Sequence, residues 1–143
     1  MKIKPCQSYV SMFLLISLIF LMSQTLVTDS LFDKIRVHVV NRFQNETLEI
    51  HCKSMDDDLG LHHIPANQEF NWHFRIAIFK KTLFFCDTWW RGGKASFHAF
   101  SAEEGFLKFS GDRDCMWRGN EDGMSLLDYH HQQYHLMHRW ESS

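Results

Sequence analysis

The feature that most constrains the fold is a regular alternation of apolar and polar side chains in the segment FNWHFRIAIF, residues 70–79. Successive side chains of a β-strand point to opposite faces of a sheet, whereas a helix repeats about every 3.6 residues. The segment is therefore predicted to be a strand with one buried face. The apolar residues on that face are Phe70, Trp72, Phe74, Ile76 and Ile78.

Similar short segments, rich in aromatic and β-branched residues, recur along the chain and are separated by turn-forming stretches. Only SAEEGFLKF, residues 101–109, departs from this pattern, and it is expected to carry one turn of helix. The prediction is an all-β fold, either an antiparallel sandwich or a barrel. The further predicted strands are residues 35–43, 47–52, 82–90, 95–100, 115–119 and 124–130.

The N-terminus has the layout of a secretory signal peptide. Two lysines precede the apolar run MFLLISLIFLM, and the small polar stretch SQTLVTDS follows it. A membrane anchor is the weaker interpretation, because the run is about half of the roughly 20 residues that a spanning helix needs. We expect a signal peptide over residues 1–28, cut between 23 and 30, and one secreted, extracellular domain over 29–143. No second apolar run is present to insert the mature chain in a membrane.

The charge balance helps to define the partners. A net charge of −2 and a pI of about 6.5 give no electrostatic basis for nucleic-acid binding. Partners must therefore be selected by shape and local chemistry, and the sequence does not indicate the oligomeric state. A mature domain of this size has a small interior, and 13 Phe and 5 Trp supply large apolar side chains to fill it.

Three cysteines, Cys52, Cys86 and Cys115, remain once Cys6 is removed with the signal peptide. In an oxidising compartment an odd number permits one intramolecular bridge and leaves one thiol. Their wide spacing indicates neither a zinc site nor a thiol enzyme.

The stretch HCKSMDDDLG concentrates three acidic residues, Asp56, Asp57 and Asp58, next to a cysteine. The composition is typical of an exposed turn. A calcium loop would need ligands at alternating positions, an intervening glycine and a late glutamate, and this spacing is missing. A catalytic role lacks an identifiable acid–base partner. Because adjacent carboxylates are costly to bury, we expect an exposed, solvated loop. Its negative patch makes Asp56, Asp57 and Asp58 the candidate residues for contact with a partner.

Enzyme motifs such as Gly-x-Ser-x-Gly and His-Glu-x-x-His are missing from the sequence. An extracellular hydrolase or carbohydrate-active sandwich remains the alternative, and it would need a nucleophile–base pair or two carboxylates in a cleft. The tail YHHQQYHLMHRW places His131, His135 and His138 at helical spacing, which would suit a metal. A solvated tail or a final edge strand is the favoured interpretation, so no metal or cofactor is expected.

Asn45-Glu46-Thr47 is an N-glycosylation acceptor in a polar turn between two predicted strands. In a secreted chain, an exposed acceptor of this kind is accessible to the glycosylation machinery. We therefore expect a glycan on Asn45.

The run HCKSMDDDLG, followed by FNWHF, TLFFC and CMW, resembles the plant self-incompatibility protein homologue family, also called the S-protein homologues. The similarity extends from about residue 37 to residue 123. It implies a secreted β-sandwich of two sheets held by disulfides. It also implies a non-enzymatic signalling role, because prototype members are pistil-side ligands of a pollen membrane receptor. The expected partner is therefore an unidentified plant membrane receptor.

The chain departs from this family at one position. Members usually carry a fourth cysteine shortly before the C-x-W cysteine, and Ser110 occupies the corresponding place in KFSGDRDCMW. One of two family bridges is therefore expected to be missing. The favoured pairing is Cys52 with Cys115, which leaves Cys86 free or as an alternative partner, although the sequence does not fix the connectivity.

Overall fold

The computed structural model describes residues 6–27, 34–76, 81–111 and 113–142. The chain divides into two compact units, Met1–Asp33 and Lys34–Ser143, and each is described by itself. The first unit contains helix α1 (Cys6–Val27). Among the described helices, none has the length and apolar character required to cross a membrane. The expected cleavage window begins within α1, and its last residues, 28–30, lie outside the described part of the chain.

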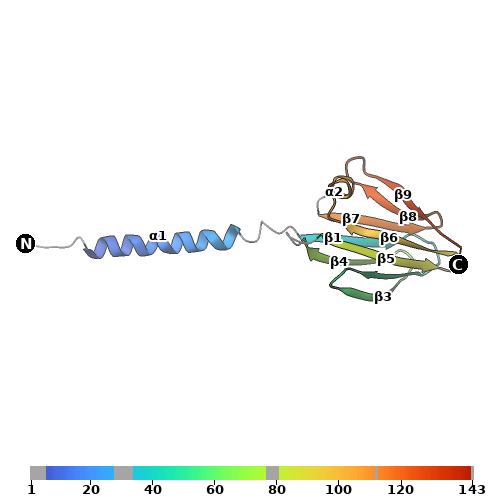
Figure 1. Ribbon diagram of the computed structural model, residues 1–143, viewed down its shortest axis with the longest axis horizontal. Coiled ribbons are helices and arrows are strands. Elements are labelled where there is room, and N and C mark those ends of the chain that lie inside the picture. Colours follow the sequence, from blue (N-terminus) through green and yellow to red (C-terminus); the bar gives the residue numbers. More distant parts are fainter. Residues whose placement is uncertain (1–5, 28–33, 77–80, 112, 143) are drawn as a thin grey trace, which may run out of the picture. The chain divides into compact units, whose positions relative to one another are not determined.

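The second unit consists of two packed β-sheets (Figure 1). The larger sheet has the strand order β4-β1-β7-β8-β9, and the smaller one has the order β3-β2-β5-β6. The all-β, two-sheet prediction is confirmed. The strands are β1 (Lys34–Asn41), β2 (Leu48–Lys53), β3 (Asp58–Ile64), β4 (Glu69–Arg75), β5 (Leu83–Trp90), β6 (Gly93–Ser101), β7 (Asp114–Asn120), β8 (Gly123–Asp128) and β9 (Gln133–Arg139).

One strand pair departs from the antiparallel expectation. β1 pairs with β7 in parallel, with Val37 opposite Cys115 and Val39 opposite Trp117. The other neighbouring strands within each sheet are antiparallel. Parallel neighbours require a long connection, and here the intervening chain builds β4 and the whole smaller sheet before it returns as β7.

The core lies between the sheets, because alternate residues of each inner strand point inward. In β1 and β2 the exposed or half-buried positions alternate with completely buried ones. The buried side chains include Ile35, Val37, Val39, Leu48, Ile50, Phe97, Trp117, Met124 and Leu126.

Asn41 is a polar residue in this core, and all of its side-chain groups are bonded. Its amide donates to the carbonyl oxygens of Glu46 (2.7 Å) and Ile64 (2.8 Å), and its Oδ1 accepts from the amide of Phe43 (2.8 Å). A buried amide is tolerated only when it is paired in this way. Asn41 thereby joins the end of β1, the β1–β2 connection and the end of β3.

Two elements differ from the sequence prediction. Helix α2 (Glu104–Ser110) is longer than the single turn expected between β6 and β7. β3 was not predicted, because most of its side chains are exposed and its sequence, DLGLHHI, lacks a regular alternation. The histidine-rich tail forms the edge strand β9, as the favoured interpretation expected, and not a helix.

Candidate functional site

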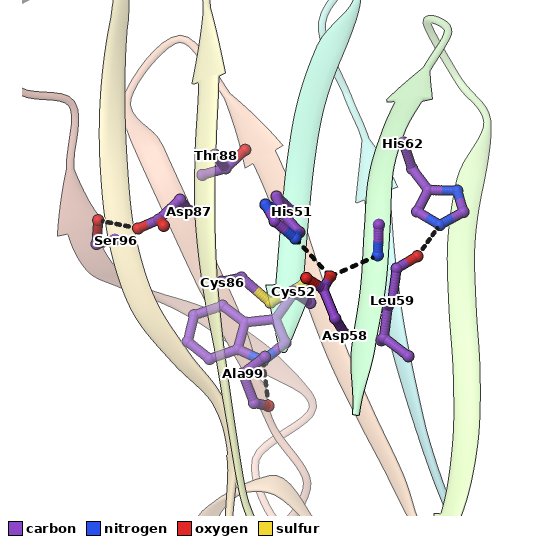
Figure 2. The surroundings of a disulfide bond; sticks show 12 residues. His51, Cys52, Asp58, Leu59, His62, Cys86, Asp87, Thr88, Ser96 and Ala99 are labelled. Carbon is purple, nitrogen blue, oxygen red and sulfur yellow. Dashed lines mark hydrogen bonds and ion pairs between the residues drawn. A yellow bond between two sulfur atoms is a disulfide. The ribbon is translucent and has the colours of Figure 1, made fainter. Parts of the chain in front are cut away.

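The disulfide joins Cys52 of β2 to Cys86 of β5, and this corrects the expected pairing of Cys52 with Cys115 (Figure 2). The physical reason is strand register. β2 and β5 are antiparallel neighbours in which Cys52 lies directly opposite Cys86, with their Cα atoms 4.1 Å apart. Cys115 lies on β7 of the other sheet, so Cys86 is bridged and Cys115 is the free cysteine.

Cys115 is buried, and its thiol donates to the Ser110 hydroxyl oxygen at 3.4 Å. The Ser110 hydroxyl in turn donates to the carbonyl oxygen of Phe106 at 2.9 Å. Burial raises the pKa of the Cys115 thiol to about 11. The thiol is therefore neutral at physiological pH, and a neutral buried thiol is a poor nucleophile.

The acidic run begins in a short loop, residues 54–57, which connects β2 to β3. The amide of Ser54 donates to the Asp57 carbonyl oxygen at 2.7 Å, and the amide of Asp57 donates to the Ser54 hydroxyl oxygen at 3.1 Å. These bonds hold the loop closed through main-chain atoms of Asp57. Met55 at its tip is 95% exposed, and Asp56 and Asp57 are also exposed.

Asp58 differs from its two neighbours because it is the first residue of β3. Its Oδ1 accepts from the Gly60 amide (2.9 Å) and lies 2.6 Å from His51 Nε2 on β2 (Figure 2). The bond from the Gly60 amide, and then the one from His51, lowers the pKa of the Asp58 carboxyl. Gly60 has a φ of +75°, a conformation that favours glycine. Asp58 therefore stabilises the β2–β3 pair.

A hollow of about 720 Å³ lies beside the acidic loop. Asp56 and Asp57 contribute carboxylates to its lining, and Arg75 and Lys81 contribute cations. The hollow therefore combines an apolar surface with charged groups of both signs, which suits a protein segment more than a small apolar molecule. Its apolar lining comes from Met55, Phe74, Leu83, Phe84 and Phe85.

The outer face of the smaller sheet carries a row of polar side chains, but their bonds do not form a catalytic set (Figure 2). The Ser96 hydroxyl donates to Asp87 Oδ1 at 2.6 Å, while His51 is bonded to Asp58. A nucleophilic serine would instead need a base such as histidine as its partner. Among the described residues, no group of three or more His, Cys, Asp or Glu side chains is placed to hold a metal ion.

The expected glycosylation site and the acidic loop lie at opposite ends of the sandwich. Asn45 is exposed in the β1–β2 connection, immediately before β2, whereas the acidic loop immediately follows β2. A strand of this length separates its two ends by about 17–20 Å. The attachment point for a glycan on Asn45 would therefore be separated from the hollow by the length of β2.

The model of the family described as plant self-incompatibility protein S1 matches residues 36–140, which include every strand of the β unit in whole or in part. The chain belongs to this family. S-protein homolog 5 of Arabidopsis thaliana is 37% identical over 93 residues, which are 64% of this chain and 69% of that protein. Self-incompatibility protein S1 of Papaver rhoeas is 30% identical over 115 residues, 75% of this chain and 78% of that protein.

A third relative is S-protein homolog 24 of Arabidopsis thaliana. It is 32% identical over 124 residues, covering 83% of this chain and 79% of that protein. Membership of the self-incompatibility protein S1 family confirms the resemblance drawn from HCKSMDDDLG and the aromatic strands. HCKSMDDDLG spans the end of β2, the acidic loop and the start of β3. It therefore includes Cys52 of the disulfide and the residues whose hydrogen bonds hold the acidic loop.

Sequence reasoning missed two parts of the site. It treated Asp56, Asp57 and Asp58 as equivalent, and it gave no sign of the hollow beside them. Gly60 is the signal in the sequence that distinguishes Asp58 from Asp56 and Asp57. A glycine two residues after an aspartate is typical of a turn in which the carboxylate accepts a hydrogen bond from a main-chain amide. The hollow had no local signal, because β4, β5 and the loop meet only in the folded chain.

Proposed function

We propose that this protein is a secreted, non-enzymatic plant signalling protein that acts as the ligand of a cell-surface receptor. Its surface for the receptor is the acidic loop with the adjoining hollow. The observation that carries the proposal is a pair of exposed carboxylates, Asp56 and Asp57, on a loop that its own main-chain bonds hold closed beside an apolar surface. A preorganised loop loses little entropy when it binds.

The family supports the signalling role, because one relative bears the name self-incompatibility protein S1. The N-terminal segment with the layout of a signal peptide supports delivery to the extracellular space, where a receptor domain is accessible. The exposed carboxylates suit a receptor loop that carries basic residues, since complementary charges raise the rate of encounter.

The test is binding of the mature protein to immobilised vesicles prepared from plant plasma membranes. We expect Asp56→Asn with Asp57→Asn to slow association several-fold, and raised salt to produce the same effect in the unmodified protein. Stability should change by less than about 1 kcal/mol, because both side chains are exposed and the loop bonds use main-chain atoms of Asp57.

The matched control is Glu121→Gln with Asp122→Asn in the β7–β8 turn, an exposed acidic pair at the opposite end of the sandwich. It changes the net charge equally and should leave association unchanged. Equal slowing by both double variants would assign the effect to net charge and not to this loop. Binding that survives protease treatment of the vesicles would exclude a protein receptor.

A further inference from the structure

The edge strands β6 and β9 of the two sheets face one another, and in the described part of the chain their main-chain pairing is confined to one end, near the start of β6. The Lys94 amide donates to the Glu141 carbonyl oxygen (2.9 Å), and the Glu141 amide donates back to the Lys94 carbonyl oxygen (2.8 Å). If the antiparallel pairing of Lys94 with Glu141 continued along both strands, His98 would lie opposite Met137. Instead, both residues line a cavity of about 390 Å³ between the strands.

The inner lining of this cavity is aromatic. Phe97 and Trp117 pack with their ring centroids 4.5 Å apart at its floor, but they are only 3% and 1% exposed. The accessible apolar surface therefore comes from Phe106 of α2, which is half-buried, and from Met137, which is 47% exposed. The indole N–H of Trp117 donates to the Ala99 carbonyl oxygen at 2.9 Å, so it is not available to a ligand. The cavity therefore favours a flat apolar group, which can pack offset or edge-on against the Phe106 ring and contact the Met137 sulfur.

Two imidazoles, His98 and His138, add polar character to the lining. His98 is exposed, and His138 is half-buried with its ring centroid 6.0 Å from that of Phe97. Burial, and then the charge of His98, lowers the pKa of His138. Among the described residues that line the cavity, His98 and His138 are the side chains that can titrate, because Cys86 is held in the disulfide. This described lining contains no Asp or Glu side chain.

We propose that this cavity binds a small aromatic carboxylate, with its ring against Phe106 and Met137 and its carboxylate bonded to His98 and His138. The volume lies within the range of about 300–1,000 Å³ that is usual for small-molecule sites. An anion would relieve the repulsion between the two imidazoles by pairing with them. A sugar fits less well, because the lining offers few polar partners for its hydroxyl groups. The proposal does not depend on the receptor surface, which lies on the acidic loop.

The test is a calorimetric titration of the mature protein with 2-naphthoate at about pH 5, because the lowered pKa of His138 means that this imidazole is protonated only at a lower pH. We expect saturable binding, and about tenfold weaker binding of the neutral isostere 2-naphthamide, because a charge-assisted hydrogen bond is lost. NMR signals of the His98 and His138 rings should shift during the titration. Equal affinity for the two compounds, or no saturation at millimolar concentration, would overturn the proposal.

Met137→Glu locates the site, because Met137 lines the cavity and is 47% exposed, so the change is tolerated by the core. A carboxylate at this position should weaken 2-naphthoate binding at least about tenfold through repulsion. The matched control is Leu61→Glu on β3, another exposed apolar residue that lines neither this cavity nor the hollow, which should bind 2-naphthoate as the unmodified protein does. Unchanged binding to Met137→Glu, with thermal unfolding that shows a folded domain, would place the ligand elsewhere.

Discussion

Replacing Ser110 with cysteine should create a second disulfide, to Cys115. The Ser110 hydroxyl oxygen lies 3.4 Å from the Cys115 sulfur, and both side chains are buried, so the new thiol would face its partner without a large movement. Ser110 ends α2, and Cys115 is the second residue of β7. The bridge would therefore fix the end of the helix to the larger sheet.

The size of the effect follows from two opposing contributions. A bridge that closes a loop of about six residues stabilises the folded state by about 2 kcal/mol in the chain-entropy model. The substitution also removes the hydrogen bond from Ser110 to the Phe106 carbonyl oxygen, which costs about 1 kcal/mol. The net gain is about 1 kcal/mol, or a rise in Tm of about 4 °C for a domain of this size.

The assay is thermal unfolding of Ser110→Cys with and without a reductant that opens the new bridge, together with peptide mapping of the oxidised protein. Ser110→Ala measures the lost hydrogen bond alone and should be about 1 kcal/mol less stable than the unmodified protein. Two free thiols at residues 110 and 115 in oxidised, denatured Ser110→Cys would refute the geometric reasoning. A bridge from residue 110 to Cys52 or Cys86 would refute it equally.

Three further predictions follow from the site. The mature, folded protein should resist alkylation, because Cys115 is buried and its pKa is raised to about 11. Unfolding without reductant should expose one reactive thiol per chain. Three reactive thiols per chain would exclude the Cys52–Cys86 bridge. Protein secreted from plant cells should lose mass on glycosidase treatment, and Asn45→Gln should abolish this loss; an unchanged mass in the unmodified protein would contradict occupancy. The lowered pKa of Asp58 contributes stability that is present above the ordinary value of 3.8 and is lost as the pH falls below it. Denaturant unfolding of Asp58→Asn should therefore show a smaller loss of stability at acid pH than the unmodified protein shows. An equal loss of stability in both proteins would exclude this role.

Most of the fold could be predicted because its inner strands each bury one face. The alternation in the inner strands β1 and β2 follows from the requirement that every second side chain enters the core, so the sequence alone locates these strands. β3 escaped prediction because it is an edge strand with little buried surface. Its place depends on contacts with β2, such as the 3.0 Å pair between His63 and Glu49, which no local pattern encodes.

The cysteine pairing could not be predicted for a related reason. Cys52 and Cys86 are 34 residues apart, and they meet because β2 and β5 pair in one particular register. A shift of that register by one residue would turn each side chain to the other face of the sheet. Cys115 is as completely buried as Cys52 and Cys86, so burial does not distinguish the three candidates.

The parallel pairing of β1 with β7 bears on how the chain folds as it is made. β1 emerges first in the β unit, yet it is an inner strand of its sheet, and one of its two neighbours is β7. His38 of β1 lies opposite Met116 of β7, so the two partners leave the ribosome far apart in time. Until β7 is synthesised, an apolar strand edge remains unpaired, and such edges are prone to aggregation. The larger sheet therefore closes only after the whole smaller sheet has been synthesised, and until then the β1 edge is open to pairing with another chain.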